Sequence, residues 1–182
     1  MFGRSPSKPA RPLVSKVTVF TRPRSHRAVL VAGELTMPCT IGKGGATRAK
    51  REGDGRTPRG PMTVLAWYGP SGPGRLPYRG EPRTITATVG WCDDPRSASY
   101  NRPVRLPVSA SHESMARRDG KYDIVGVLDW NVLPRIRGRG SAIFFHINDD
   151  PTGGTEGCVA LTRAQMRRLL PRLSKKVVFV VT

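Results

Sequence analysis

A histidine and a cysteine that stand twelve positions apart are the residues of this chain whose types and surroundings best suit catalysis. His146 follows the apolar run 143–145, and Cys158 follows Gly157 in a polar, glycine-rich turn. A free thiol ionises near pH 8.5, so a neighbouring imidazole helps to form the thiolate at neutral pH. The turn between the two residues can fold back and bring the imidazole within hydrogen-bonding distance of the sulfur. The pattern therefore fits a cysteine nucleophile with a histidine base.

The same two residues also fit a structural interpretation. A buried thiol and a hydrogen-bonded core histidine are common in proteins, and on the bare residues that interpretation is the more frequent one. Gly157 bears on the choice because a residue without a Cβ lets a reacting carbonyl approach closely. Backbone N–H groups of a glycine-containing turn are suitable donors to an oxyanion.

The charge of the chain restricts its partners. It has 31 Lys and Arg against 13 Asp and Glu, a net charge of +18, and no acid before Glu34 or after Glu156. Such a surface favours polyanions, which include nucleic acid, a membrane surface and an anionic envelope polymer. No zinc finger, RNA-recognition signature or aromatic-basic interleaving is present, so we do not expect nucleic acid as the partner. A basic polyanion-binding protein is nevertheless the rival hypothesis from another functional class.

The cysteines and histidines exclude several kinds of site. Cys39, Cys92 and Cys158 are an odd number with wide spacing, so at least one thiol should be free, and whether Cys39 and Cys92 pair stays open. The three histidines are far apart and no i, i+4 pair occurs, so we expect neither a metal nor a cofactor. No stretch is long and apolar enough to span a bilayer, and residues 1–12 lack the apolar core of a secretion signal.

The elements that must position these residues are mainly strands. Residues 1–13 are a basic, proline-rich lead that we expect to be flexible, and residues 14–182 are expected to form one catalytic domain, most simply a monomer. Short runs rich in Val, Ile and Thr, bounded by turn residues, predict strands. These runs are 17–19, 28–32, 36–41, 62–66, 84–89, 124–128, 143–147 and 177–181.

Two helices and one site-forming loop complete the prediction. Residues 162–173 begin with a Thr162/Gln165 capping box and carry an apolar face, and Pro171 should limit the last turn. Residues 111–118 are a weaker helix candidate. The loop 42–60 is glycine-rich and basic, and long loops of this kind often form sites.

Two motifs resemble those of the L,D-transpeptidase (YkuD-type) family. Thr155-Glu156-Gly157-Cys158-Val159 is similar to the family's active-site motif, in which a Ser or Thr, a variable residue, Gly-Cys and an apolar residue follow a histidine. Residues 42–44 and 54–62 resemble its upstream Thr-Pro-x-Gly turn that leads into a strand. The motifs occur in the family's order over residues 14–182.

The resemblance implies a mainly β (α+β) fold, a mixed β-sandwich with a helix packed beside the catalytic turn. It implies that Cys158 forms a thioester with a peptidoglycan stem peptide, with His146 as base and Gly157 and Thr155 shaping the oxyanion turn. The acyl group then passes to an amine of a neighbouring stem, which cross-links the wall. A stem-peptide hydrolase, a carboxypeptidase or amidase on the same fold, is the alternative, and neither donor length nor acceptor amine follows from the sequence.

Departures from the family pattern point to further binding residues. Ala160 stands where many members have Arg, Ile147 where many have Gly, and Glu156 where another His is frequent. Arg137 and Arg139 are candidates to bind a substrate carboxylate, with a solvated basic turn as the competing interpretation. Three more candidates for substrate binding are Ser141, Tyr122 and His112, with structural packing as the competing interpretation for Tyr122 and a surface helix start for His112.

The expected location follows from the expected substrate. A peptidoglycan enzyme works in the periplasm or cell envelope, although this chain shows no signal peptide. The route of export is therefore left open. The positive charge would hold the protein at an anionic envelope polymer or membrane surface.

Overall fold

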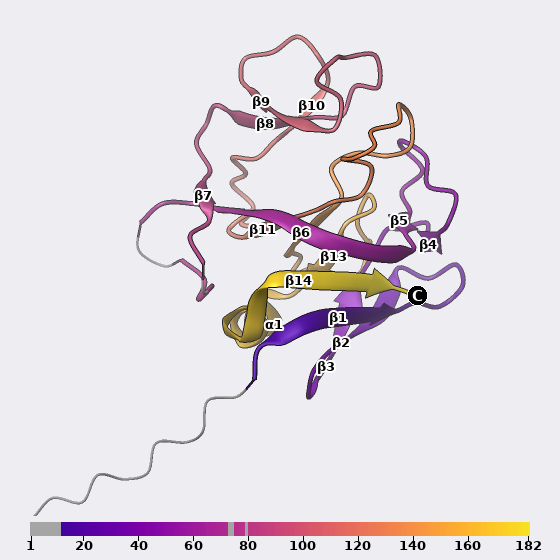
Figure 1. Ribbon diagram of the computed structural model, residues 1–182, viewed down its shortest axis with the longest axis vertical. Helices are drawn as coiled ribbons and strands as arrows, with labels where there is room; N and C mark the ends of the chain where they lie inside the picture. Colours follow the sequence, from indigo (N-terminus) through magenta and orange to yellow (C-terminus); the bar gives the residue numbers. More distant parts are fainter. Residues whose placement is uncertain (1–11, 73–74, 79) are drawn as a thin grey trace, which may run out of the picture.

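The computed structural model describes residues 12–72, 75–78 and 80–182 (Figure 1). All but the last two residues of the predicted lead, 1–13, lie outside the described residues. The strands of the large sheet are β1 (Val14–Phe20), β2 (Arg27–Ala32), β3 (Leu35–Thr40), β6 (Gly60–Gly69), β7 (Arg83–Thr84), β11 (Val125–Leu128), β12 (Phe144–Ile147), β13 (Val159–Leu161) and β14 (Leu173–Val181). Two smaller sheets contain β8 (Val89–Cys92), β9 (Arg102–Arg105) and β10 (His112–Ser114), and β4 (Ala46–Thr47) and β5 (Thr57–Pro58).

The large sheet closes on itself. Its strand order is β11-β12-β13-β3-β2-β1-β14-β6-β7, and β11 also pairs with β6. The predicted mainly β fold is confirmed, and the two layers of the expected sandwich are continuous because this extra pairing joins them. Alternation along the strands fills the interior: Val17 and Val19 of β1 face the same core as Phe145 of β12 and Phe179 of β14.

The predicted helix 162–173 is shorter than expected. α1 spans Arg163–Leu169 and begins with the Thr162/Gln165 capping box that the sequence predicted. A 3-10 turn, η1 (Leu170–Arg172), follows at Pro171, whose missing N–H cannot continue the α-helical bonding. The last predicted helical residue, Leu173, already belongs to β14, beside which α1 lies in Figure 1. No helix in the described ranges has the length and apolar character to cross a bilayer.

Two predictions for segments around the three-stranded sheet of β8, β9 and β10 were wrong. Residues 111–118 contain β10 instead of a helix, because they have no apolar helical repeat and their backbone pairs with β8, His112 opposite Cys92. The predicted strand 84–89 is interrupted: β7 ends at Thr84, and the Val89 N–H donates to the Thr86 carbonyl at 3.0 Å and closes a turn before β8. Pairing with distant strands decided both segments.

Candidate active site

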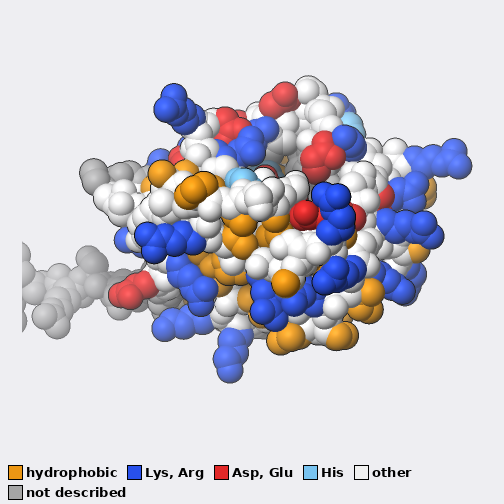
Figure 2. Space-filling view, turned by 90° about the horizontal axis from the view of Figure 1, so that it is seen from above, with side chains coloured by type: hydrophobic (Ala, Val, Ile, Leu, Met, Phe, Trp, Pro, Cys, Tyr) orange, Lys and Arg blue, Asp and Glu red, His pale blue; other side chains and the backbone are white. Residues whose placement is uncertain are grey.

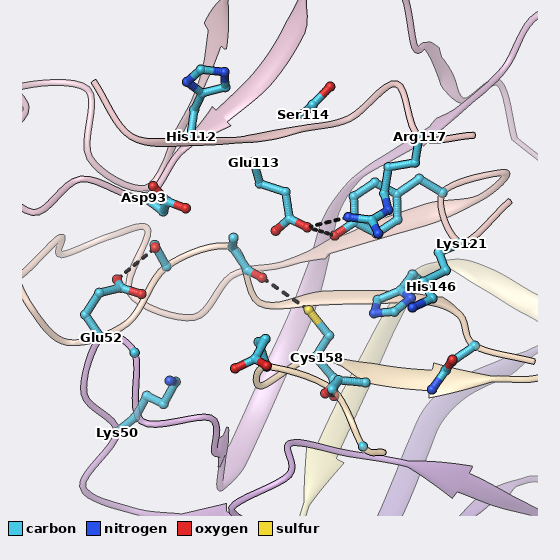
Figure 3. Close-up of a pocket in the computed structure, with 18 residues that line it drawn as sticks. Lys50, Glu52, Asp93, His112, Glu113, Ser114, Arg117, Lys121, His146 and Cys158 are labelled. Atoms are coloured by element: carbon cyan, nitrogen blue, oxygen red, sulfur yellow. Dashed lines mark hydrogen bonds and ion pairs between the residues drawn. The ribbon is translucent and has the colours of Figure 1, made fainter. Parts of the chain in front are cut away.

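Strand register brings His146 and Cys158 to one face of the sheet. β12 and β13 are parallel, with Phe145 opposite Val159 and both side chains in the main core. Because side chains alternate along a strand, His146 and Cys158 project from the opposite face. Both line a cavity of about 710 Å³. Figure 3 shows the imidazole and the sulfur side by side in this cavity.

Thr155 fixes the turn that carries the cysteine. Its hydroxyl donates to the Cys158 carbonyl at 2.7 Å and accepts from the Gly157 N–H at 3.2 Å. Gly157 has a φ of +142°, and a Cβ there would lie 2.9 Å from the Arg56 carbonyl oxygen. The turn therefore requires glycine for conformation and for space.

The upstream glycine-rich loop supports the same turn. The Lys43 N–H donates to the Thr155 carbonyl at 2.8 Å, and the Thr155 N–H donates to the Ile41 carbonyl at 2.9 Å. Thr57, buried in β5, accepts from the Gly42 N–H at 2.8 Å. The two sequence motifs, far apart along the chain, thus form one hydrogen-bonded unit.

His146 is a neutral imidazole with one nitrogen held by the backbone. Its Nδ1 lies 2.7 Å from the Ile147 carbonyl oxygen, which can only accept, so Nδ1 carries the proton and Nε2 is left to act as a base. Burial lowers the pKa of His146 to about 4, and Lys121 and Arg117 act in the same direction, against the opposing effect of the Ile147 bond. The imidazole is therefore uncharged at neutral pH.

Cys158 is a protonated thiol whose hydrogen bonds go to the backbone and not to the histidine. Its Sγ–H donates to the Ala142 carbonyl at 3.3 Å, and the Phe144 N–H donates to Sγ at 3.3 Å. Burial raises the pKa of Cys158 to about 12, and the charge of Glu113 adds to this, whereas the Phe144 N–H and Lys50 lower it. Among the described residues His146 makes no hydrogen bond to the thiol, so this is a resting arrangement.

This Gly-Cys turn and its histidine lie inside a region that matches a known family. The YkuD family model, the L,D-transpeptidase catalytic domain, matches residues 16–181. The chain belongs to the YkuD family. A search of curated proteins found no match. Members of the family are generally cysteine-dependent L,D-transpeptidases that act on the cell wall.

In this YkuD domain the loop 131–142, which we call the arch, ends at Ala142, whose carbonyl accepts the hydrogen bond of the Cys158 thiol. Ala142 has a φ of +50°, which is uncommon for a residue with a Cβ. Its N–H donates to Oδ1 of Asn101 at 3.1 Å. Asn101 is 2% exposed, accepts also from Trp91 Nε1 at 3.0 Å, and donates to the carbonyls of Trp130 and Asn131 at 3.1 and 2.8 Å. All the hydrogen-bonding capacity of this buried amide is thus used on the arch and its supports.

Two carboxylates in the cavity have different surroundings. Oε2 of Glu52 accepts from the Ser141 hydroxyl at 2.8 Å and also from the Tyr100 hydroxyl. Glu113 accepts from the Tyr122 hydroxyl at 2.5 Å, and burial raises the pKa of Glu113 above its usual range despite that bond. The Tyr122 ring in turn meets the His146 ring edge-on, with centroids 5.4 Å apart.

The cavity collects most of the residues that the sequence singled out. His146, Cys158, Thr155, Ser141, Tyr122 and His112 all line it. Gly157 does not line it, and its N–H is engaged by Thr155. His112 reaches the cavity from β10, where its Nδ1 lies 2.9 Å from the Ala110 carbonyl.

The structure does not bring the arginine pair to the cavity. Arg137 donates to the Arg96 carbonyl at 3.2 Å, and Arg139 is exposed. Three other basic residues line it: Lys50, Arg117 and Lys121. Lys50 is 3% exposed and paired with Asp54 at 2.5 Å. Lys50 lies in the glycine-rich loop that the sequence analysis predicted to form a site. Arg117 and Glu113 were not predicted as site residues, because their segment was wrongly predicted to be a helix.

The acids of the cavity are not arranged for a metal. Within residues 12–72, 75–78 and 80–182, no group of three or more His, Cys, Asp or Glu side chains could hold a metal ion. What the arrangement offers is a thiol, a neutral imidazole and hydrogen-bonded carboxylates around one cavity. These are groups for nucleophilic attack and proton transfer.

Proposed function

We propose that the protein is a cysteine-dependent L,D-transpeptidase that cross-links peptidoglycan stem peptides, with Cys158 as nucleophile and His146 as general base. The observation that carries the proposal is the projection of His146, on β12, and of Cys158, in the turn that leads into the neighbouring parallel strand β13, into one cavity of a YkuD domain. The protonated Nδ1 of His146 supports it, because the opposite nitrogen then has a lone pair for the thiol proton.

The first half of the reaction forms a thioester. The thiol leaves the Ala142 carbonyl and gives its proton to Nε2 of His146, and the sulfur attacks the carbonyl carbon that follows the L-centre of the donor stem. The tetrahedral intermediate then collapses: the C–N bond breaks, the imidazolium protonates the departing amine, and a terminal D-amino acid leaves. The acyl group stays on Cys158.

The second half transfers the acyl group. An amine of a neighbouring stem attacks the thioester carbon, His146 takes a proton from the attacking nitrogen, and the C–S bond breaks. The sulfur recovers the proton from His146, and the new amide is the cross-link. Water in place of the amine would give a hydrolase with the same residues.

The Cys158 N–H is our candidate for the oxyanion donor. It belongs to the residue that carries the sulfur, and Gly157 beside it leaves space for the carbonyl oxygen. The Gly157 N–H already donates to Thr155, so in our proposal it stabilises the turn and not the oxyanion.

A positively charged surface suits the envelope location that the substrate requires. Figure 2 shows Lys and Arg side chains around the margin of one face of the molecule. We propose that the net charge of +18 holds the protein at an anionic wall polymer or membrane surface in the periplasm or envelope. A reporter fusion that stays entirely cytoplasmic would overturn this part of the proposal.

Product analysis tests the activity. A purified stem-tetrapeptide muropeptide is incubated with the protein and, in parallel, with Cys158→Ala, and products are separated and identified by mass spectrometry. We expect a cross-linked dimer and released D-Ala with the wild type and neither with the variant. A shortened monomer without dimer would indicate the hydrolase, and no product at all would contradict both.

A further inference from the structure

Glu113 is a partly buried carboxylate in the cavity, and the acylation step does not use it. It lies on β10, opposite Trp91 of β8. Its Oε1 is held by the Tyr122 hydroxyl at 2.5 Å and by Arg117 Nη1 at 3.6 Å. Its Oε2 has no hydrogen bond or ion pair within the described part of the chain. Figure 3 shows the carboxylate directed into the cavity above Cys158, whereas His146 lies beside the sulfur.

A count of protons shows that transfer to an amine needs a second acceptor. A primary amine of the lysine type has a pKa near 10.4, so it arrives as an ammonium ion with three protons, and only one remains on the amide nitrogen. His146 can take one of the other two and return it to the sulfur. The remaining proton must leave the ammonium before the nitrogen has a lone pair for attack. Attack by water needs one base, since its single transferred proton goes through His146 to the sulfur.

We propose that Glu113 is the second base of the transfer step: its free oxygen binds the acceptor ammonium and removes the proton that His146 cannot. This inference rests on the proposed function and names the acceptor as a protonated primary amine. In balance, the ammonium gives one proton to Glu113, the neutral nitrogen attacks the thioester carbon, and His146 moves the second proton to the departing sulfur. Glu113 then releases its proton to water.

The surroundings distinguish Glu113 from Glu52 and Glu156, two of the other three acids that line the cavity. Glu52 is already engaged by Ser141 and Tyr100, and Glu156 pairs with Lys43 at 2.7 Å. Among the carboxylates, Glu113 has the largest effect on the pKa of the Cys158 thiol, ahead of Glu156, which indicates that its charge acts on the reacting sulfur. Arg117 is also bound to Asp119 at 2.6 Å, so its charge is shared between two acids. Burial makes Glu113 a stronger base than an exposed glutamate.

The test is the partition of the acyl-enzyme between amine and water. Wild type, Glu113→Gln and Glu81→Gln are incubated with stem tetrapeptide, and D-Ala release, hydrolysed monomer and cross-linked dimer are quantified by mass spectrometry. Glu113→Gln removes the base but keeps an oxygen that can accept from Tyr122. Glu81→Gln removes the same charge from an exposed position outside the cavity. If Glu113→Gln does not fold, Glu113→Asp, which withdraws the carboxylate by one methylene, is measured instead.

We expect Glu113→Gln to lower the dimer-to-monomer ratio about 100-fold, the lower end of what general bases contribute, and to leave the acyl-enzyme formation rate within about threefold. Glu113→Asp should lower the same ratio by about tenfold, and Glu81→Gln should leave it unchanged. An unchanged ratio in the Glu113 variants, or an equal loss of acylation and transfer, overturns the inference while the proposed function stands. A wild type that only hydrolyses overturns the inference and indicates the hydrolase in place of the transpeptidase. A wild type that forms no acyl-enzyme overturns the proposed function and the inference together.

Discussion

Two sides of the cavity hold their functional groups in different ways. The floor consists of β12, β13 and the turn 155–158, and it positions His146 and Cys158 through strand register and backbone hydrogen bonds. The wall consists of the small sheet β8–β10 and the segment 115–123, and it presents Glu113 and Tyr122 through side-chain hydrogen bonds and ring contacts. The floor is built into the main core, whereas the wall packs on a second cluster that includes Trp91 and Phe144.

Because the two sides hold their functional groups differently, we expect them to have different roles in the reaction. A backbone-held imidazole and a turn that admits only glycine can move little, which suits bond-making atoms that need fixed geometry. Side chains joined through one hydroxyl or one carboxylate oxygen can exchange partners when a substrate arrives. We therefore expect floor substitutions to affect every step and wall substitutions to affect the choice of acceptor.

Replacing the proposed base, His146, should have the largest effect on activity, and this substitution changes the floor of the cavity only. His146→Gln removes the lone pair that receives the thiol proton, so we expect kcat/KM for D-Ala release to fall by about 10³-fold. His26→Gln, at a histidine outside the cavity, should stay within about threefold. Steady-state assays on both variants check this, and a loss under tenfold in His146→Gln would show that another group accepts the proton.

The arch between floor and wall should be the most sensitive point for stability. Asn101→Ala leaves the Ala142 N–H and Trp91 Nε1–H without their partner, and we expect the free energy of unfolding to fall by about 3 kcal/mol. Asn131→Ala removes bonds from a partly exposed residue of the same arch and should cost about 1 kcal/mol. Urea denaturation measures both, and equal losses would show that the arch is not held chiefly by Asn101.

The resting thiol should react slowly and without a neutral-pH plateau. Because the pKa of Cys158 is raised to about 12, its thiolate fraction at pH 7 to 9 should rise about tenfold per pH unit. Alkylation by iodoacetamide, followed by peptide mapping to separate Cys158 from Cys39 and Cys92, should accelerate about 100-fold over that range. A rate that levels off below pH 8 would indicate that a thiolate–imidazolium pair exists before substrate binds.

The glycine of the floor should show the smallest of these effects. Gly157→Ala places a Cβ 2.9 Å from the Arg56 carbonyl in a backbone conformation that side chains disfavour, and we expect a loss of about 2 kcal/mol in stability. Gly153→Ala, in the same loop with open space around the Cβ, is the matched control and should be nearly neutral. Thermal unfolding compares the two variants. Indistinguishable midpoints would show that the turn does not require glycine at position 157.

The floor was largely predictable from the sequence and the wall was not. An apolar run that ends in His146, a Gly-Cys turn and the Thr162/Gln165 cap are local signals, and each lies where it was predicted. The segment of Glu113 carries no local strand signal. It becomes β10 because β8 offers backbone partners twenty or more residues earlier in the chain, which a single sequence does not display.

Site residues divide in the same way. Lys50 and Glu52 fall in a glycine-rich loop whose composition already suggested a site, so the loop was predictable although the individual side chains were not. Arg137 and Arg139 had the right chemistry to bind a carboxylate, but their charge does not show where the side chains point in the folded protein. Arg137 bonds to a distant backbone carbonyl outside the cavity. Asn101 had no signal at all, because its role depends on four partners in three separate segments.

The most direct test of the account is the covalent state of Cys158 during turnover. Wild type and Cys158→Ala are mixed with a stem tetrapeptide, quenched in acid within seconds, and analysed by intact-protein and peptide-level mass spectrometry. We predict that the wild type gains the mass of the tripeptide acyl group on the peptide that contains Cys158, with loss of one D-Ala, and that the variant gains nothing. An unmodified Cys158 while product accumulates, or the same adduct in the variant, would contradict the assignment of Cys158 as nucleophile.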